Sequence, residues 1–150
     1  MSQQENLKAL LLANVALAAV IGALILALLL IRVPFLAASK SKAWTHAKTR
    51  AQFATVPVPA LSVSINDNIA NTFETPILFF VVSGLLIASN LPISDEIVTL
   101  ANFYVASRAV HSVVQSLQGP ITVRFAVFAL GLGALGKIWV DFALAVRQMA

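Results

Sequence analysis

A long apolar run near the start of the chain limits what it can fold into more than any other feature. Between Ala9 and Ile31 the only polar side chain is that of Asn14. As an α-helix this run reaches roughly 34 Å, enough to cross a hydrocarbon core about 30 Å thick. A secretory signal peptide has an apolar region of only about 7–15 residues behind a basic start, whereas one lysine, Lys8, precedes this run. We therefore predict a retained transmembrane helix.

Three further apolar segments have lengths that fit membrane-spanning helices. We place the four spans at about residues 7–36, 68–91, 95–118 and 120–147. Pro76 is expected to bend the second span or to begin its regular part, and Ser94 to cap the third. Gly119-Pro120 is expected to end the third span, with Pro120 in the first turn of the fourth. The predicted fold is all-α, an integral membrane four-helix bundle that forms a single domain over residues 1–150.

Composition and charge exclude several classes of function. Only 11% of the residues are charged, against about 25% in an average soluble domain. The chain has no cysteine and two histidines, so cysteine nucleophiles are excluded and no metal site is predicted. The net charge is +4, and its largest basic cluster, Lys40, Lys42, Lys48 and Arg50, is typical of a cytoplasmic loop. We predict a lipid bilayer as the environment and no nucleic acid as a partner.

The charges of the connections predict the orientation. The connection at residues 37–67 carries the basic cluster, whereas residues 89–96 carry only acidic charges, and Arg124 closely follows the third connection. By the positive-inside rule the first and third connections face the cytoplasm, and both termini lie outside it. The 37–67 connection is long enough to be a lid or a binding segment. A plain solvated connector is an equal alternative.

Several polar side chains fall inside the predicted spans, where charges must face the bundle interior, pair or meet water. Arg108, His111 and Gln115 share one helical face, because they are spaced by three, four and seven residues. With the predicted orientation, Glu74 and Arg124 lie at a similar depth. Two arginines against one carboxylate favour an anionic ligand, or an anion formed during a reaction. The alternatives are a structural Glu74–Arg108 clamp, a core histidine bonded to a backbone carbonyl, and an Arg124 side chain that extends to a lipid phosphate.

Other features of the fourth span have structural interpretations. Lys137 and Asp141 are i,i+4 neighbours that can neutralise each other. The glycines at 131, 133 and 136 permit close approach of a neighbouring helix.

Two stretches carry a resemblance to a known family. They are NTFETPILFFVVSGLL (71–86) and YVASRAVHSVVQSLQGPITVRFAVFALG (104–131). Together they contain N-x-x-E, then R-x-x-H, then a second arginine sixteen residues after the first. On these residues the chain resembles the MAPEG family, the membrane-associated proteins of eicosanoid and glutathione metabolism, and most of all its uncharacterised bacterial members.

The resemblance implies a homotrimer in a bacterial inner (plasma) membrane, with glutathione bound as a cosubstrate between subunits near the cytoplasmic face. It implies that Arg124 is the catalytic residue and stabilises the glutathione thiolate, which is the nucleophile. The residues that the resemblance places around the cosubstrate are Arg32, Asn71, Glu74, Arg108, His111 and Gln115. The second substrate would be a lipophilic electrophile or hydroperoxide from the bilayer.

The chain also departs from the family's glutathione-using members. Gln115 and Phe128 stand where those members carry tyrosines, and Ala70 replaces a basic residue.

Two classes of function therefore stay open. One is a membrane-bound glutathione-dependent transferase or peroxidase. The other is a non-enzymatic integral membrane protein, or an accessory subunit of a larger membrane complex. A transporter is disfavoured, because the outer half of the bundle offers only the Lys137–Asp141 pair to a polar solute.

Overall fold

The computed structural model describes residues 1–38 and 58–149 of the chain, so the basic cluster at residues 40–50 lies outside the described residues. The described part is helical throughout and contains no strand. Its helices are α1 (Gln3–Ala38), α4 (Ala60–Thr72), α5 (Pro76–Ala88), α6 (Asp95–Ser116) and α7 (Ile121–Arg147). With α4 and α5 taken together, four helical stretches in this part are long and apolar enough to cross a membrane. The predicted all-α class is confirmed.

The second span differs from the prediction at both ends and in the middle. It begins at Ala60 rather than near residue 68, is interrupted over residues 73–75, and ends at Ala88. The interruption has a clear cause: Pro76 has no backbone N–H and its ring clashes with a preceding helical turn, so α5 restarts with proline at its first position.

The earlier start is explained by polar side chains that find partners. Asn68 is fully buried, and its Nδ2 donates to the backbone oxygen of Ser112 at 2.8 Å and to Oγ of Ser116 at 3.0 Å. Thr72 donates to the backbone oxygen of Asn68 at 2.7 Å. Before residue 68, Oγ of the buried Ser62 donates to the backbone oxygen of Pro59 at 2.8 Å, and Oγ of Ser64 accepts from Nε2 of Gln118 at 2.8 Å. Because these polar groups find partners within the protein, the stretch before residue 68 continues the helix.

The ends of α6 follow local sequence signals, with one shift. Ser94 caps the helix as predicted, its side chain accepting a hydrogen bond from the Ile97 N–H at 3.2 Å. At the other end Gln118, not Gly119, takes the left-handed conformation, with φ 55°. Gly119 donates to the backbone oxygen of Val114 at 2.7 Å, and a Cβ there would lie 2.7 Å from Val114 Cγ1. Glycine is thus required for close approach, and Pro120 precedes α7 as its N-cap instead of lying in the first turn.

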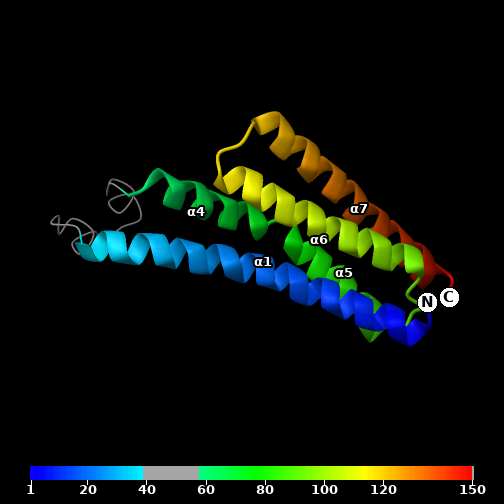
Figure 1. Cartoon of the computed structure of the whole chain (residues 1–150). Helices are drawn as coiled ribbons and strands as arrows, with labels where there is room; N and C mark the ends of the chain where they lie inside the picture. Colours follow the sequence, from blue (N-terminus) through cyan, green and yellow to red (C-terminus); the bar gives the residue numbers. More distant parts are fainter. Residues whose placement is uncertain (39–57, 150) are drawn as a thin grey trace.

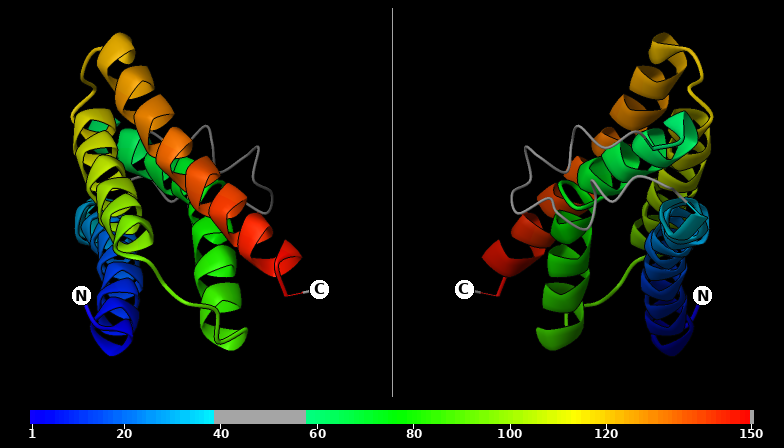
Figure 2. Two further views of the ribbon diagram at one scale, coloured as in Figure 1. Left: turned by 90° about the vertical axis from the view of Figure 1, so that its right-hand side faces the viewer. Right: turned by 90° about the vertical axis from the view of Figure 1, so that its left-hand side faces the viewer.

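The helices form an elongated bundle with both termini at the same end, as Figure 1 shows. Helix α6 is central, because it contacts α1, α4 and α7. The two views in Figure 2 show α7 crossing beside α6 on the side away from α1.

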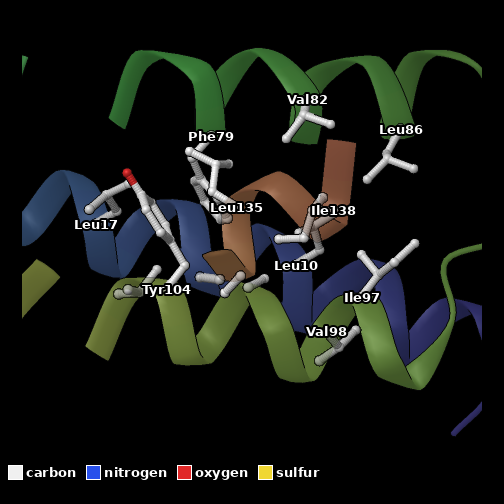
Figure 3. Packing of buried hydrophobic residues seen from close by; sticks show 14 of the residues in the cluster. Leu10, Leu17, Phe79, Val82, Leu86, Ile97, Val98, Tyr104, Leu135 and Ile138 are labelled. Carbon is white, nitrogen blue, oxygen red and sulfur yellow. The ribbon is translucent and has the colours of Figure 1, made fainter. Parts of the chain in front are cut away.

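The apolar core lies in the half of the bundle nearer the termini. Figure 3 shows its side chains converging from α1, α5, α6 and α7. Tyr104 stacks on Phe79 with ring centroids 5.0 Å apart, and its hydroxyl lies 3.3 Å from Oγ1 of Thr75 in the helix break. The buried residues of α1 are all in its first half, the last being Leu17. In the other half of the bundle the buried side chains of α4 and α6 are mostly polar, among them Asn68, Thr72 and His111.

One glycine brings α6 and α7 close together. A Cβ on Gly131 would lie 2.2 Å from Oγ of Ser107 and 3.2 Å from its Cβ. A Cβ on Gly133 or Gly136 would meet nothing within 4 Å. Close approach of another helix is therefore confirmed at Gly131, whereas for Gly133 and Gly136, which meet nothing in the described single chain, it stays a prediction.

Candidate functional site

A cavity of about 320 Å³ lies between α4, α6 and α7, in the half of the bundle away from the termini. Its lining contains five of the seven candidate site residues together with three apolar side chains of α7: Asn71, Glu74, His111, Gln115, Arg124, Ile121, Phe125 and Phe128. The structure thus brings groups from three predicted spans to one place.

The local structure explains why these side chains meet. Asn71 lies in the last turn of α4, and Glu74 lies in the break before Pro76. His111 and Gln115 are one turn apart on α6 and face the same side. The tight turn at residues 117–120 brings Arg124, in the first turns of α7, back beside that face.

His111 links α6 to α7. Its Nδ1 lies 3.0 Å from the backbone oxygen of Arg124, and its Nε2 lies 2.8 Å from Oε1 of Gln115. Because a carbonyl oxygen only accepts, Nδ1 carries a proton and donates to Arg124. The His111 ring also contacts Phe128, with centroids 5.9 Å apart. These contacts match the structural alternative for His111, a core histidine bonded to a backbone carbonyl.

Arg108 lies behind the cavity lining rather than in it. Its side chain is only 1% exposed, and its guanidinium carbon is 5.5 Å from the centroid of the Phe128 ring. None of its three guanidinium nitrogens has a hydrogen-bond acceptor in the described part of the chain. No ion pair there joins it to Glu74, which is exposed. The proposed Glu74–Arg108 clamp is therefore not formed within the described single chain.

Arg124 is half-buried, and its Nε is buried without an acceptor among the described residues. It also lines a second, smaller cavity of about 150 Å³, together with Ser64, Asp67, Gln115 and Gln118. The two cavities share Gln115 and Arg124. Asp67 and Gln118 were missed in the sequence. Asp67 lies one turn before Asn71 on the same helical face, which becomes visible once α4 is known to begin at Ala60.

Arg32 lies near the end of α1 and lines neither polar cavity. Its neighbour Ile31 lines an almost wholly apolar groove of about 480 Å³ between α1, α4 and α6. A single chain therefore does not bring Arg32 to the other six candidate residues.

The described ranges contain no group of three or more His, Cys, Asp or Glu side chains that could hold a metal ion.

Comparison with known proteins places the chain in a family. Searches of curated proteins and of solved structures find no match. A family model does match: that of the MAPEG family aligns with residues 10–144. This range takes in both polar cavities and most of all four membrane-length helices. The chain belongs to the MAPEG family.

Proposed function

We propose that this protein is a membrane-bound glutathione-dependent transferase or peroxidase that acts on lipophilic electrophiles or hydroperoxides. The MAPEG family includes such enzymes. The observation that carries the proposal is the cavity in which Arg124 meets Asn71, Glu74 and Gln115. Its volume of about 320 Å³ lies in the range of about 300–1,000 Å³ that is usual for small-molecule sites.

Arg124 is proposed to stabilise the thiolate of glutathione. A free thiol has a pKa of about 8.5, and only the thiolate is a good nucleophile. A guanidinium about 4 Å from the sulfur, in surroundings with an effective dielectric constant of about 20, would favour ionisation by about 4 kcal/mol, or about three pKa units. Arg108, next to Phe128 of the cavity lining, adds positive potential of the same sign. The thiolate would then attack a substrate arriving from the bilayer. At an electrophilic carbon it would form a thioether and expel the leaving group with its electron pair; at a hydroperoxide it would break the O–O bond, giving glutathione sulfenic acid and, after protonation of the alkoxide by water, an alcohol.

The polar groups around Arg124 would hold the rest of the tripeptide. Asn71 and Gln115 can donate and accept hydrogen bonds, and Glu74 accepts them. Arginine forks bind carboxylates through paired hydrogen bonds, a role that the resemblance gives to Arg32.

We propose a homotrimer in a bacterial inner (plasma) membrane, with the cavities near the cytoplasmic face and both termini outside the cytoplasm. Three observations support an assembly of several copies in a membrane. Arg32 lines neither polar cavity of a single chain, so an Arg32 that contributes to the site would come from a neighbouring copy. Arg108 lacks an acceptor among the described residues. Large apolar side chains are exposed along α1, α5, α6 and α7, as expected of surfaces that face lipid or another subunit.

The test is calorimetric titration of the detergent-purified protein with glutathione, beside Arg124→Ala and Arg147→Ala. Arg147 is a matched control, because it is an exposed arginine at the far end of the same helix and lines neither polar cavity. We expect saturable binding in the parent and in Arg147→Ala, and loss of binding in a folded Arg124→Ala. No binding by the parent at millimolar glutathione would refute the proposal.

A non-enzymatic membrane protein, or an accessory subunit of a larger membrane complex, is the second candidate. The contacts of His111 favour it, because both ring nitrogens already lie at hydrogen-bonding distance from groups of the same chain. The experiment that separates the two candidates is Glu74→Gln. If glutathione does not bind and Glu74→Gln breaks up the oligomer in size-exclusion chromatography, the polar cluster is a structural clamp and the second candidate is correct.

A further inference from the structure

The smaller cavity is an extension of the proposed glutathione site on its α4 side. It lies beside the larger cavity, since both are lined by Gln115 and Arg124. Ser64, Asp67 and Asn71 are spaced by three and four residues on α4 and therefore form one polar face. Ser64 and Asp67 line the smaller cavity, and Asn71 lines the larger. A ligand that fills the larger cavity can thus reach the smaller one along this face.

Within the described ranges, neither charged group of the smaller cavity, Asp67 or Arg124, takes part in an ion pair. Asp67 makes no ion pair with Arg124, although both line a cavity of only about 150 Å³. No hydrogen bond to the Asp67 carboxylate is present among the described residues either. Glu74 lines the larger cavity together with Arg124 and is likewise without an ion pair in the described part of the chain. An arginine that shares one cavity with each of two unpaired carboxylates suits a ligand that carries both signs of charge.

One wall of the smaller cavity is held in place at a conformational cost. Gln118 has φ 55°, a left-handed conformation that costs free energy for any residue with a Cβ and that glycine usually occupies after a helix. Its side-chain Nε2 donates to Oγ of Ser64 at 2.8 Å and so joins the α6–α7 turn to α4. That bond leaves the amide oxygen of Gln118 as an acceptor. A glycine at this position would relieve the backbone but would remove this wall.

We propose that Asp67 binds the ammonium group of the thiol cosubstrate, whose sulfur lies on the other side of Arg124. The inference rests on the proposed function, because it assigns a subsite to that function's cosubstrate. An ammonium group has three donors and no acceptor, and the cavity offers the Asp67 carboxylate and the Gln118 amide oxygen as acceptors. Charge-assisted bonds of this kind are stronger than neutral ones. The cosubstrate class is therefore a thiol with a free α-ammonium group, and thiols without one are excluded.

The test compares glutathione with its des-amino analogue, in which hydrogen replaces the ammonium group. Both are titrated by calorimetry into the full-length detergent-purified protein and into Asp67→Asn, Asp67→Glu and Asp141→Asn. Asp141 is the control, because it pairs with Lys137 and lines neither polar cavity. Because Asp67 is exposed, solvent screens its charge, and we expect the parent and Asp141→Asn to bind glutathione roughly 2- to 5-fold more tightly than the analogue.

In Asp67→Asn the ratio of the two affinities, glutathione over the analogue, should fall to near one. Glutathione should bind more weakly than to the parent, and the analogue should bind equally well. Asp67→Glu, which keeps the carboxylate, should restore part of the ratio. A parent that binds glutathione and the analogue equally, or a ratio that persists in Asp67→Asn, would overturn the ammonium subsite and leave the proposed function standing. A parent that binds neither thiol would overturn both.

Discussion

Replacing Gly131 of α7 by alanine tests how closely α6 and α7 approach at Ser107. The new Cβ would lie 2.2 Å from Oγ of Ser107, 3.2 Å from its Cβ and 3.7 Å from Cδ2 of Tyr104. Oγ of Ser107 donates to the backbone oxygen of Tyr104 at 2.7 Å. Rotation of the serine would move Oγ away and break that bond, yet the two Cβ atoms would still be too close. The helices must therefore separate or shift.

The size of the effect follows from three contributions. Loss of the serine hydrogen bond costs about 0.5–1.5 kcal/mol, and overpacking of a tight contact costs about 1–3 kcal/mol. Alanine gains up to about 1 kcal/mol over glycine in a helix. We expect Gly131→Ala to lower the free energy of unfolding by about 1–3 kcal/mol. Each kcal/mol corresponds to about 2–4 °C in Tm for a chain of this size.

Thermal unfolding in detergent, followed by circular dichroism, is the assay. Gly133→Ala is the matched control, because a Cβ there meets nothing within 4 Å, so its Tm should be unchanged or raised. Ser107→Ala in the Gly131→Ala background should recover about half of the loss, since it removes Oγ but leaves the contact between Cβ atoms. If Gly131→Ala is as stable as Gly133→Ala, α6 and α7 are not packed as closely here as the argument requires.

Three further predictions concern polar groups of the bundle. Asn68→Ala should lower the free energy of unfolding by about 0.6–1.7 kcal/mol, from the mean to the largest value found for hydrogen bonds between membrane helices. Asn66→Ala, at an exposed position, should leave it unchanged, and equal Tm values for the two variants would contradict this. Ser94→Ala should lower the free energy of unfolding by about 1 kcal/mol, because the N-cap hydrogen bond is lost, whereas Ser94→Asp should keep that bond. Protection from hydrogen exchange at the first backbone amides of α6 should fall in the first variant and persist in the second. Arg108→Met should raise the free energy of unfolding of the ligand-free protein in detergent by about 1–2 kcal/mol, because a buried guanidinium without an acceptor among the described residues gives way to an apolar side chain; thermal unfolding measures it. A lower Tm for Arg108→Met would show that the arginine has an acceptor outside the described residues or in a neighbouring copy.

The spans that the sequence predicted best are those with uninterrupted apolar runs. The predicted bounds of the first, third and fourth spans are within four residues of α1, α6 and α7, because hydropathy and caps determine such ends. The start of the second span was wrong by eight residues, 68 against 60. Residues 60–68 are polar enough to look like a loop until Asn68 is seen bonded to Ser112 and Ser116 of α6. Tertiary contacts that satisfy polar groups cannot be read from local composition.

The candidate site, too, was predictable in part from the sequence and in part only from tertiary structure. Depth in the membrane, argued from span direction, was enough to group Glu74, His111, Gln115 and Arg124, which line one cavity. It could not show that the His111 ring bonds the backbone of Arg124. Nor could it show that Arg108 points behind that cavity. Those facts depend on the rotation of each helix about its axis and on the crossing of α6 and α7, which a periodicity of 3.6 residues does not fix.

The break between α4 and α5 marks the boundary between two kinds of packing. On the side of the termini, apolar side chains fill the bundle up to Tyr104, whose hydroxyl meets Thr75 in the break. On the other side, Asn68 joins α4 to α6 and His111 joins α6 to α7 through hydrogen bonds, and two polar cavities lie between these helices. A ligand that bridges α4 and α7 there adds contacts between the two helices. At a free ligand concentration of 100 times its Kd, it would stabilise the folded state by about 2.7 kcal/mol. Ligand binding thus has most to contribute in this half, where Asp67, Glu74 and Arg124 make no ion pair within the described part of the chain.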